Sequence, residues 1–546
     1  MNAIRCAGIL MFAGAVLATA GCGRTVLADP PADAAVAVNH NPSAYAYAPG
    51  AGLAKLPWIA LNPRGGGEGV ELQGAVLRYS TLLRGAGAGV GDALSDHYDV
   101  FYASAWFGEL QGDNSYWLRA GEASKPVSRY ISRFSTLPSE LRRGALKAAT
   151  PLDQKTVAEA KLAIPEALNE ALGGLDLSAY TRPLFPAFYA DGQVTHGVKI
   201  ETLRFTSVSP SGQPIEASAL LAYPDDLSSQ QTPPPLVSYQ HYTDGGDKST
   251  SDASDVRAIA MAYAARGAVF VAADTVGIGA SKGEPLSYLL WANAANTYYD
   301  GILAANNRLA AEKRIGRPLS RLHLVGYSKG GFGTLALAET LESLYGTPAE
   351  KVYFGAAPLD MPRTFDAYLK QRGQRDVGGN KFAENLDAEV LESYIKEAIL
   401  PSWGAVLPRE IGVAKLYDAA GQLDAGFADR YLAGTDDSNI GLKSFMEANS
   451  FTERTTFLSR FPLTQSKVRA FHYAKDPVIP AENTEAFMRL AAAKGVPDVQ
   501  RGDCREATRQ FVVLQRLTLF LSASDRANTL HALCGFSMLD ASLGDL

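Results

Sequence analysis

The feature that most constrains the fold is a serine bracketed by glycines, Gly326-Tyr327-Ser328-Lys329-Gly330. It is preceded by a short apolar run, Leu322 to Val325, which is typical of a buried strand, and followed by a run, Thr334 to Leu344, that predicts a helix. A serine between a strand and a helix sits on a sharp turn, so its neighbours must be small for the two backbones to approach. The pattern predicts a nucleophile elbow in an α/β fold, with Ser328 as the nucleophile.

The same five-residue pattern occurs a second time, from Gly279 to Gly283, with Ser281 at its centre. Gly277 and Gly279 separate this serine from the preceding apolar run, and Pro285 follows the pattern closely. A helix is therefore not expected to begin directly after Ser281. We interpret Ser281 as a loop serine and not as the nucleophile.

Length and composition describe an ordinary globular protein. The chain has 546 residues, of which 47% are hydrophobic and 20% are charged. This length allows two or three domains, or one fold with large insertions. A formal net charge of −6, without a basic stripe, argues against a nucleic-acid partner.

The N-terminus predicts export. Met1 to Gly21 combines a positive start at Arg5 with an apolar stretch that is too short to span a membrane stably. The segment ending at Cys22 resembles a lipoprotein signal box, which predicts a lipid on Cys22 and membrane attachment, with an outer-membrane address. The alternative is cleavage after Ala28, which would leave a soluble periplasmic or secreted enzyme.

Cysteine usage agrees with export. Cys6 leaves with the signal, and Cys22 either carries the lipid or leaves too, so the mature chain keeps Cys504 and Cys534. In an oxidising compartment these two are expected to form a disulfide. The alternative is a pair of buried thiols.

The core begins with alternating apolar residues. Val198 to Thr206 and Ile215 to Leu221 flank a turn-rich segment and predict an antiparallel hairpin. Further strands are expected at Pro235 to Tyr239 and Ala268 to Ala272, with a helix at Ala292 to Glu312. This order predicts a mostly parallel central sheet flanked by helices.

The loop after Tyr239 is a candidate for holding the oxyanion of a tetrahedral intermediate. In hydrolases of this architecture this loop donates one backbone N–H, and the residue after the nucleophile donates the other. We expect Thr243 and Lys329 to supply them, with Tyr242 as the alternative to Thr243. His241 is expected to brace the loop by hydrogen bonds.

A serine nucleophile needs a base, and an imidazole suits this role near neutral pH. Only two of the seven histidines, His472 and His531, follow Ser328, and the chain order serine, acid, histidine excludes the rest. The run Phe511 to Leu521 predicts the last strand. We therefore expect His531, in the loop after it, to be the base.

The acid is expected in the loop after the strand Lys467 to Tyr473, which includes His472. Asp476 lies in that loop and would hold the base in the correct tautomer. The alternative acid is Asp360, which follows the apolar run Val352 to Ala357.

Three segments in this order resemble the secretory lipase family of α/β-hydrolases: Ser238-Tyr239-Gln240-His241, the loop Asp274 to Ser281, and Gly326 to Gly331. Asp476-Pro-Val-Ile-Pro is similar to that family too. The resemblance extends from Val198 to the C-terminus. It implies ester hydrolysis by a Ser-Asp-His triad, often on acyl glycerols. No metal or organic cofactor is expected.

This sequence departs from that family at two positions. Tyr242 stands where the family often has glycine, and Lys329 stands where glutamine is common. Both positions lie at the expected oxyanion hole, so the resemblance does not fix the acyl-chain preference.

Between Asp360 and Phe461 lies an insertion with helix-like runs at Asp387 to Leu400 and Gly441 to Ala448, and Trp403 between them. Such an insertion is expected to form a cap with apolar walls over the site. The alternative is a packing annex without contact to substrate.

The sequence therefore predicts an exported carboxylesterase or lipase acting on a small-molecule or lipid ester. Rival functions are a serine peptidase on the same fold and an inactive surface lipoprotein that acts as a binding module. The expected segments, in order, are a signal peptide (1–21), a tether (22–95), an N-terminal extension (96–190), the first part of the hydrolase core (191–360), the cap insertion (361–460) and the second part of the core (461–546).

Overall fold

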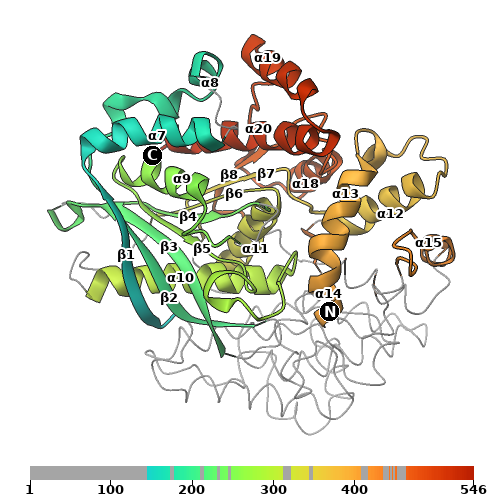
Figure 1. The fold of residues 1–546 in the computed structure, drawn as a ribbon, viewed down its shortest axis with the longest axis horizontal. Coiled ribbons are helices and arrows are strands. Elements are labelled where there is room, and N and C mark those ends of the chain that lie inside the picture. The colour runs from blue at the N-terminus through green and yellow to red at the C-terminus, as the bar shows by residue number, and fades with distance from the viewer. Residues whose placement is uncertain are drawn as a thin grey trace, which may run out of the picture.

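The computed structural model describes residues 144–171, 178–209, 214–229, 234–243, 248–311, 321–343, 348–406, 416–433, 442, 446, 449–451 and 463–546 (Figure 1). The predicted export signal, Cys22 and the tether lie outside the described residues, as does most of the expected helix at 441–448. Among the described helices, none has the length and apolar character needed to cross a bilayer.

Within the described residues, nine strands form one sheet in the order β1-β2-β3-β5-β4-β6-β7-β8-β9. The strands are β1 (Leu146–Lys155), β2 (Val198–Val208), β3 (Pro214–Pro224), β4 (Leu236–Gln240), β5 (Val269–Ala273), β6 (Leu322–Tyr327), β7 (Lys351–Gly355), β8 (Lys467–Phe471) and β9 (Val499–Arg501).

The sheet is antiparallel at one end and parallel over the rest. β1, β2, β3 and β5 pair antiparallel, and β5, β4, β6, β7, β8 and β9 pair parallel. The expected hairpin is β2 and β3, which pair along their whole length. β1, from the expected N-terminal extension, adds an edge strand that the sequence analysis did not predict. The carboxyl ends of the parallel strands share one edge of the sheet, where ligands of such folds usually bind.

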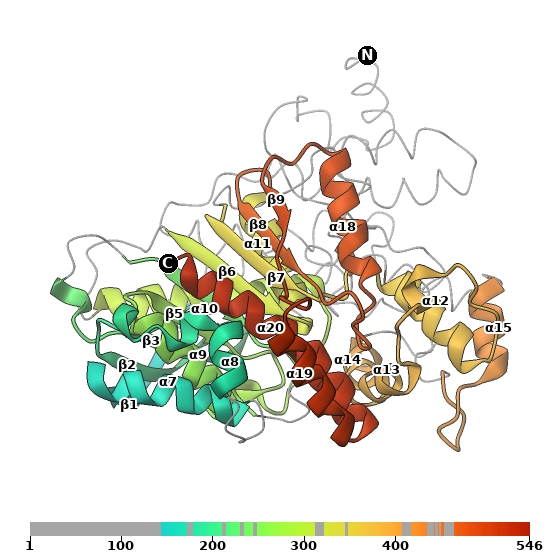
Figure 2. The same cartoon turned by 90° about the horizontal axis from the view of Figure 1, so that it is seen from above.

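Helices cover both faces of the sheet (Figures 1 and 2). α10 (Trp291–Ala311) and α11 (Lys329–Ser343) pack on one face, and α7 (Val157–Ala171), α9 (Ser254–Ala264) and α20 (Ala523–Gly544) pack on the other. Strands β4, β5 and β6 are buried throughout, as expected for strands covered on both sides. The remaining helices of the core are α8 (Ser178–Leu184), α18 (Glu482–Ala493) and α19 (Arg509–Leu517).

The insertion after β7 forms a separate group of helices at one side of the sheet (Figure 2). These elements are α12 (Met361–Arg372), α13 (Ala388–Tyr394), a π-helical turn (Ile395–Ile399), α14 (Leu400–Val406) and α15 (Ala425–Ala433). The predicted helical run from Asp387 to Leu400 is thus helical, with Asp387 as the N-cap of α13.

The prediction of a strand at Phe511 to Leu521 is wrong. The segment is α19 followed by a 3-10 turn, Thr518–Phe520. Its valine, phenylalanine and threonine content favours a strand, yet the buried residues Phe511, Leu514 and Thr518 recur at helical spacing. The hydroxyl of Thr508 accepts the N–H of Phe511 at 3.3 Å and caps the helix.

The prediction that His531 lies in a loop is also wrong. His531 lies inside α20, which begins after the N-cap Ser522. Every residue from Leu533 to Leu539 is buried, because α20 packs against strands β6, β7 and β8 and against Phe185. A residue on a packed helix is held more rigidly than one on a loop.

Candidate active site

Ser328 lies on the turn between β6 and α11. Its φ is +58°, in the left-handed region that costs a non-glycine residue about 1–2 kcal/mol. The turn is held by two hydrogen bonds, from Ser328 N–H to the carbonyl of Gly355 at 2.8 Å and from Phe332 N–H to the carbonyl of Ser328 at 3.1 Å. The strain expected of a nucleophile elbow is therefore present.

The two bracketing glycines are required by close backbone approach. A Cβ on Gly326 would lie 2.4 Å from the carbonyl oxygen of Gly330, and a Cβ on Gly330 would lie 1.9 Å from the carbonyl oxygen of Gln240. The second contact presses the first turn of α11 against the end of β4. It brings the start of the expected oxyanion loop next to the serine elbow.

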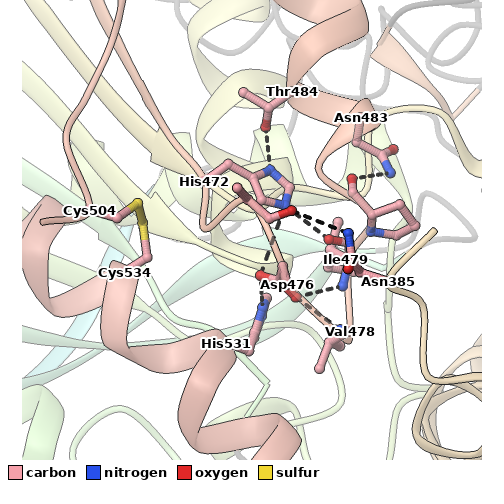
Figure 3. Close-up of polar contacts among 12 residues, drawn as sticks. Asn385, His472, Asp476, Val478, Ile479, Asn483, Thr484, Cys504, His531 and Cys534 are labelled. Carbon is pink, nitrogen blue, oxygen red and sulfur yellow. Dashed lines mark hydrogen bonds and ion pairs between the residues drawn. A yellow bond between two sulfur atoms is a disulfide. The ribbon is translucent and has the colours of Figure 1, made fainter. Parts of the chain in front are cut away.

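His531 and Asp476 come together from α20 and the loop after β8 (Figure 3). His531 Nδ1 lies 2.6 Å from Asp476 Oδ2. The second carboxylate oxygen accepts the N–H groups of Val478 and Ile479, at 2.9 and 3.0 Å. Asp476 is fully buried and His531 is 7% exposed, so bulk water does not screen their interaction.

The electrostatics of this pair fix the histidine tautomer. Burial alone would raise the pKa of Asp476, but the charge and hydrogen bond of His531, with the nearby His472 and the N–H of Ile479, hold that pKa below its usual value. An ionised carboxylate only accepts hydrogen bonds, so His531 Nδ1 carries a proton. Nε2 of neutral His531 is then the basic atom.

His531 also lies beside the elbow. Its ring centroid is 5.1 Å from that of Tyr327, the residue before Ser328, and a Cβ on Gly535, one turn further along α20, would lie 3.0 Å from the Tyr327 ring. Ser328 and His531 are not hydrogen-bonded to each other here, and His531 Nε2 has no hydrogen-bond partner among the described residues. Such contacts are often long without substrate.

His472 has a different environment from His531. It is fully enclosed and follows β8 directly, since that strand ends at Phe471. Its Nδ1 lies 2.7 Å from the hydroxyl of Thr484 and its Nε2 lies 2.9 Å from the carbonyl of Ile479. Burial lowers the pKa of His472 to about 4. This histidine is therefore neutral near pH 7, with both ring nitrogens occupied.

Of the two expected oxyanion donors, Lys329 lies at the elbow itself, and Thr243 contacts a residue that lines the pocket. Lys329 is the first residue of α11, so its backbone N–H lies at the positive end of the helix dipole, and its ammonium group donates to the hydroxyl of Thr275 at 2.9 Å. The hydroxyl of Thr243 lies 2.8 Å from that of Tyr288, and both Tyr288 and Lys329 line the pocket at Ser328.

His241 does not make the expected hydrogen bond through Nε2, although it lies within ion-pair distance of Asp255. Its Nε2 makes no hydrogen bond with any described residue and lies 3.6 Å from Asp255 Oδ2. The hydrogen bond to Asp255 comes instead from the hydroxyl of Tyr242, at 2.6 Å. The imidazole packs against the Tyr242 ring, with centroids 4.4 Å apart.

A pocket opens at Ser328. One wall comes from Val478 and Ile479, directly after Asp476, and another from Tyr288 and Leu289. The insertion supplies most of the remaining lining: Met361, Thr364, Phe365, Leu391, Tyr394, Ile395, Ile399, Trp403, Leu416, Leu442 and Met446. The insertion therefore contacts the space in front of the serine, and most of its contribution is apolar.

The insertion is also hydrogen-bonded to the loop that contains Asp476 and to α20, which contains His531. Asp387 N–H donates to the carbonyl of Pro477 at 2.8 Å, in the loop that holds Asp476. The hydroxyl of Tyr394 donates to Asn528 at 2.9 Å, one turn before His531 on α20. Sequence analysis missed these contacts because no local pattern marks a pairing between such distant segments.

Cys504 and Cys534 form the expected disulfide, with Cα atoms 4.7 Å apart. The bridge joins the segment after β9 to α20 and lies within one turn of His531 (Figure 3). It therefore constrains the helix that carries the histidine.

The alternative residues Ser281 and Asp360 make hydrogen bonds that stabilise local structure. The hydroxyl of Ser281 accepts the N–H of Gly277 at 3.0 Å and donates to the carbonyl of Ile278 at 2.9 Å, which closes its own loop. Asp360 is the N-cap of α12 and accepts the N–H of Arg363. The carboxylate in contact with His531 is that of Asp476.

No protein-family model matches the chain, and no curated protein does. Among solved structures, the rice cell wall degrading esterase LipA from Xanthomonas oryzae is similar, with a TM-score of 0.52 and 19% sequence identity over 74% of this chain and 98% of that chain. A mutant of that esterase gives a TM-score of 0.52 and 18% identity over the same shares. At this identity the likeness shows the fold alone: this chain has the α/β-hydrolase fold.

Proposed function

We propose that this chain is a serine hydrolase that cleaves carboxylic esters through Ser328, His531 and Asp476. The observation that carries the proposal is the buried hydrogen bond between His531 and Asp476, next to a strained serine turn that opens on an apolar pocket. The motifs shared with the secretory lipase family support membership of that family, which is part of the proposal.

In the first half-reaction, Ser328 Oγ attacks the ester carbonyl carbon while His531 Nε2 takes the hydroxyl proton. The carbonyl oxygen becomes negatively charged, and the N–H groups of Lys329 and Thr243 stabilise it. Collapse of the tetrahedral intermediate breaks the bond to the alcohol oxygen. His531 returns the proton to that oxygen, so the alcohol leaves and the acyl group stays on Ser328.

In the second half-reaction, water attacks the acyl carbon and gives its proton to His531. The new intermediate expels Ser328 Oγ, which recovers the proton, and the carboxylic acid is released. In both halves Asp476 stabilises the imidazolium and keeps Nδ1 protonated, which leaves Nε2 as the atom that exchanges protons.

The pocket supports an apolar acyl group as the substrate part nearest Ser328. Its lining is mostly aliphatic and aromatic, and Ser328 and Lys329 are among the few polar residues in it. Burying an alkyl chain against such a surface contributes about 0.8 kcal/mol per methylene group.

Export is part of the proposal and rests on the N-terminal sequence. The disulfide between Cys504 and Cys534 supports it, because such bonds persist in oxidising compartments. A lipid on Cys22 would hold the enzyme at a membrane, and residues 22–95 would act as the tether.

A panel of p-nitrophenyl esters from acetate to palmitate, run beside aminoacyl-naphthylamides and a fluorophosphonate probe, tests this function. We expect ester turnover, no amide turnover and labelling of Ser328. Turnover of the amides alone would favour a peptidase. Absence of both turnover and labelling would favour a binding module.

A further inference from the structure

The segment between β4 and the expected oxyanion donor contacts one carboxylate on α9. The hydroxyl of Tyr242 donates to Asp255 Oδ2 at 2.6 Å, and His241 Nε2 lies 3.6 Å from the same oxygen. Asp255 is in the first turn of α9, where the helix dipole favours negative charge. Two successive side chains of the loop thus converge on one acceptor.

This carboxylate is ionised and poorly exposed. The side chain of Asp255 is 17% exposed and that of His241 is 9% exposed. Burial alone would raise the pKa of Asp255, but the His241 ring, the Tyr242 hydroxyl and the N–H of Val256 hold that pKa below its usual value. Hydrogen bonds to an ionised acceptor away from bulk water are stronger than neutral ones.

The side chains of His241 and Tyr242 are fixed directly before Thr243, whose N–H is the expected oxyanion donor. Gln240 and His241 are in backbone contact with the elbow, since a Cβ on Gly330 would lie 1.9 Å from the Gln240 oxygen and 3.1 Å from the His241 carbonyl carbon. Tyr242 and then Thr243 follow in the chain. A shift of Tyr242 therefore moves the Thr243 N–H relative to Ser328, and misplacement by about 1 Å costs up to about a hundredfold in rate.

Other contacts hold the loop further along. Thr250 N–H donates to Asp274 at 2.6 Å, and the Thr243 hydroxyl contacts Tyr288. Among the described residues, Asp255 is the carboxylate that contacts the part of the loop directly before Thr243. No feature of the sequence singled out this residue.

We propose that Asp255 is a positioning residue for the oxyanion hole, acting through Tyr242 and His241 on the Thr243 N–H. This inference rests on the proposed ester hydrolysis. It predicts that Asp255 affects stabilisation of the tetrahedral intermediate and leaves binding of the uncharged substrate nearly unchanged.

The test compares Asp255→Asn, Tyr242→Phe and the double variant with wild type in p-nitrophenyl ester hydrolysis. Asp252→Asn is the matched control, because Asp252 is an exposed carboxylate three positions earlier that bonds the hydroxyl of Ser249. We expect kcat to fall about tenfold in both single variants, below the roughly 10²–10³-fold cost of losing an oxyanion donor, with KM changed less than about twofold. The double variant should resemble the single ones, because Asp255→Asn takes the charge from the hydrogen bond that Tyr242→Phe removes.

An alkyl trifluoromethyl ketone distinguishes positioning from a general loss of structure. Ser328 Oγ adds to its carbonyl carbon, and the hemiketal oxygen carries the negative charge that the hole stabilises. We expect its inhibition constant to rise about tenfold in Asp255→Asn, in step with kcat, while that of the alcohol with the same carbon skeleton stays within about twofold.

Any of three results would overturn the inference. These are an unchanged kcat in Asp255→Asn, a loss in the double variant equal to the product of the two single losses, and an equal loss in Asp252→Asn. These results would leave the proposed function intact. An inactive wild-type enzyme, or an active Ser328→Ala variant, would instead contradict the function itself.

Discussion

His531 Nδ1 and Asp476 Oδ2 are 2.6 Å apart, although the two residues are separated by 55 positions in the chain. Asp476 reaches this contact from the loop after β8, and His531 reaches it from inside α20 (Figure 3). The helix is fixed at one side by the disulfide at Cys534 and at the other by the bond between Tyr394 and Asn528. If His531 is the base, as proposed, it needs little reorganisation to accept a proton.

Replacing Asp476 with asparagine should abolish most activity without unfolding the protein. The amide oxygen of Asp476→Asn can still accept the N–H groups of Val478 and Ile479, but it no longer stabilises an imidazolium at His531. We expect kcat for p-nitrophenyl esters to fall about 10³–10⁴-fold, with an unchanged far-ultraviolet circular dichroism spectrum.

The control for this variant is Asp360→Asn, which alters the other candidate acid. Asp360 caps α12, and asparagine caps a helix about as well as aspartate, so this variant should fold normally and leave kcat within about threefold. Comparable losses of kcat in the two variants would contradict the assignment of the acid.

Stability should decrease as the pH falls from about 7 toward 5 because of His472. Its pKa is lowered from 6.5 to about 4 in the folded protein, so the unfolded chain binds this proton more strongly. The contribution is fully present above pH 6.5 and is lost as the pH falls toward 4. At pH 5 the loss is about 2 kcal/mol. Asp476, whose pKa is held below 3.8, titrates outside this range.

Urea unfolding at pH 7.5 and pH 5 measures this effect. His472→Gln is the matched variant, because an amide can donate to the Ile479 carbonyl and accept from the Thr484 hydroxyl without titrating. We expect its free energy of unfolding to change less between the two pH values. An identical pH dependence in the variant and the wild type would rule out His472 as the cause.

A larger side chain at Ile399 should shorten the accepted acyl chain. Ile399 lies in the π-helical turn and lines the pocket. In Ile399→Trp, the ratio of kcat/KM for p-nitrophenyl decanoate to that for the acetate should fall at least about tenfold. Glu397→Trp adds the same bulk to an exposed position of the same turn and should leave the ratio unchanged. Equal ratios in both variants would show that this wall does not contact the acyl chain.

Much of the core architecture follows from short-range pattern. Alternation predicts the hairpin of β2 and β3, and continuous apolar runs predict the buried strands β4, β5 and β6. The elbow is equally predictable, since Gly326 and Gly330 lie where a Cβ would overlap backbone or side-chain atoms. These features depend on neighbouring residues, and a sequence displays them directly.

The C-terminal elements could not be predicted in the same way. Phe511 to Leu521 combines residues of high strand propensity with a helical burial pattern, and burial against the rest of the protein decides in favour of α19. His531 could be proposed as the base from chain order, but its place inside a helix could not, because α20 is stabilised by packing against strands that are distant in the sequence. The contacts of Tyr242 with Asp255 likewise require the assembled fold.

The most direct test compares two serines that share one sequence pattern. Ser328→Ala removes the proposed nucleophile, whereas Ser281→Ala removes a hydroxyl that closes its own loop and should cost about 1 kcal/mol of stability. Initial rates with p-nitrophenyl butyrate should be undetectable for Ser328→Ala and close to wild type for Ser281→Ala. Retained turnover in Ser328→Ala would contradict the account.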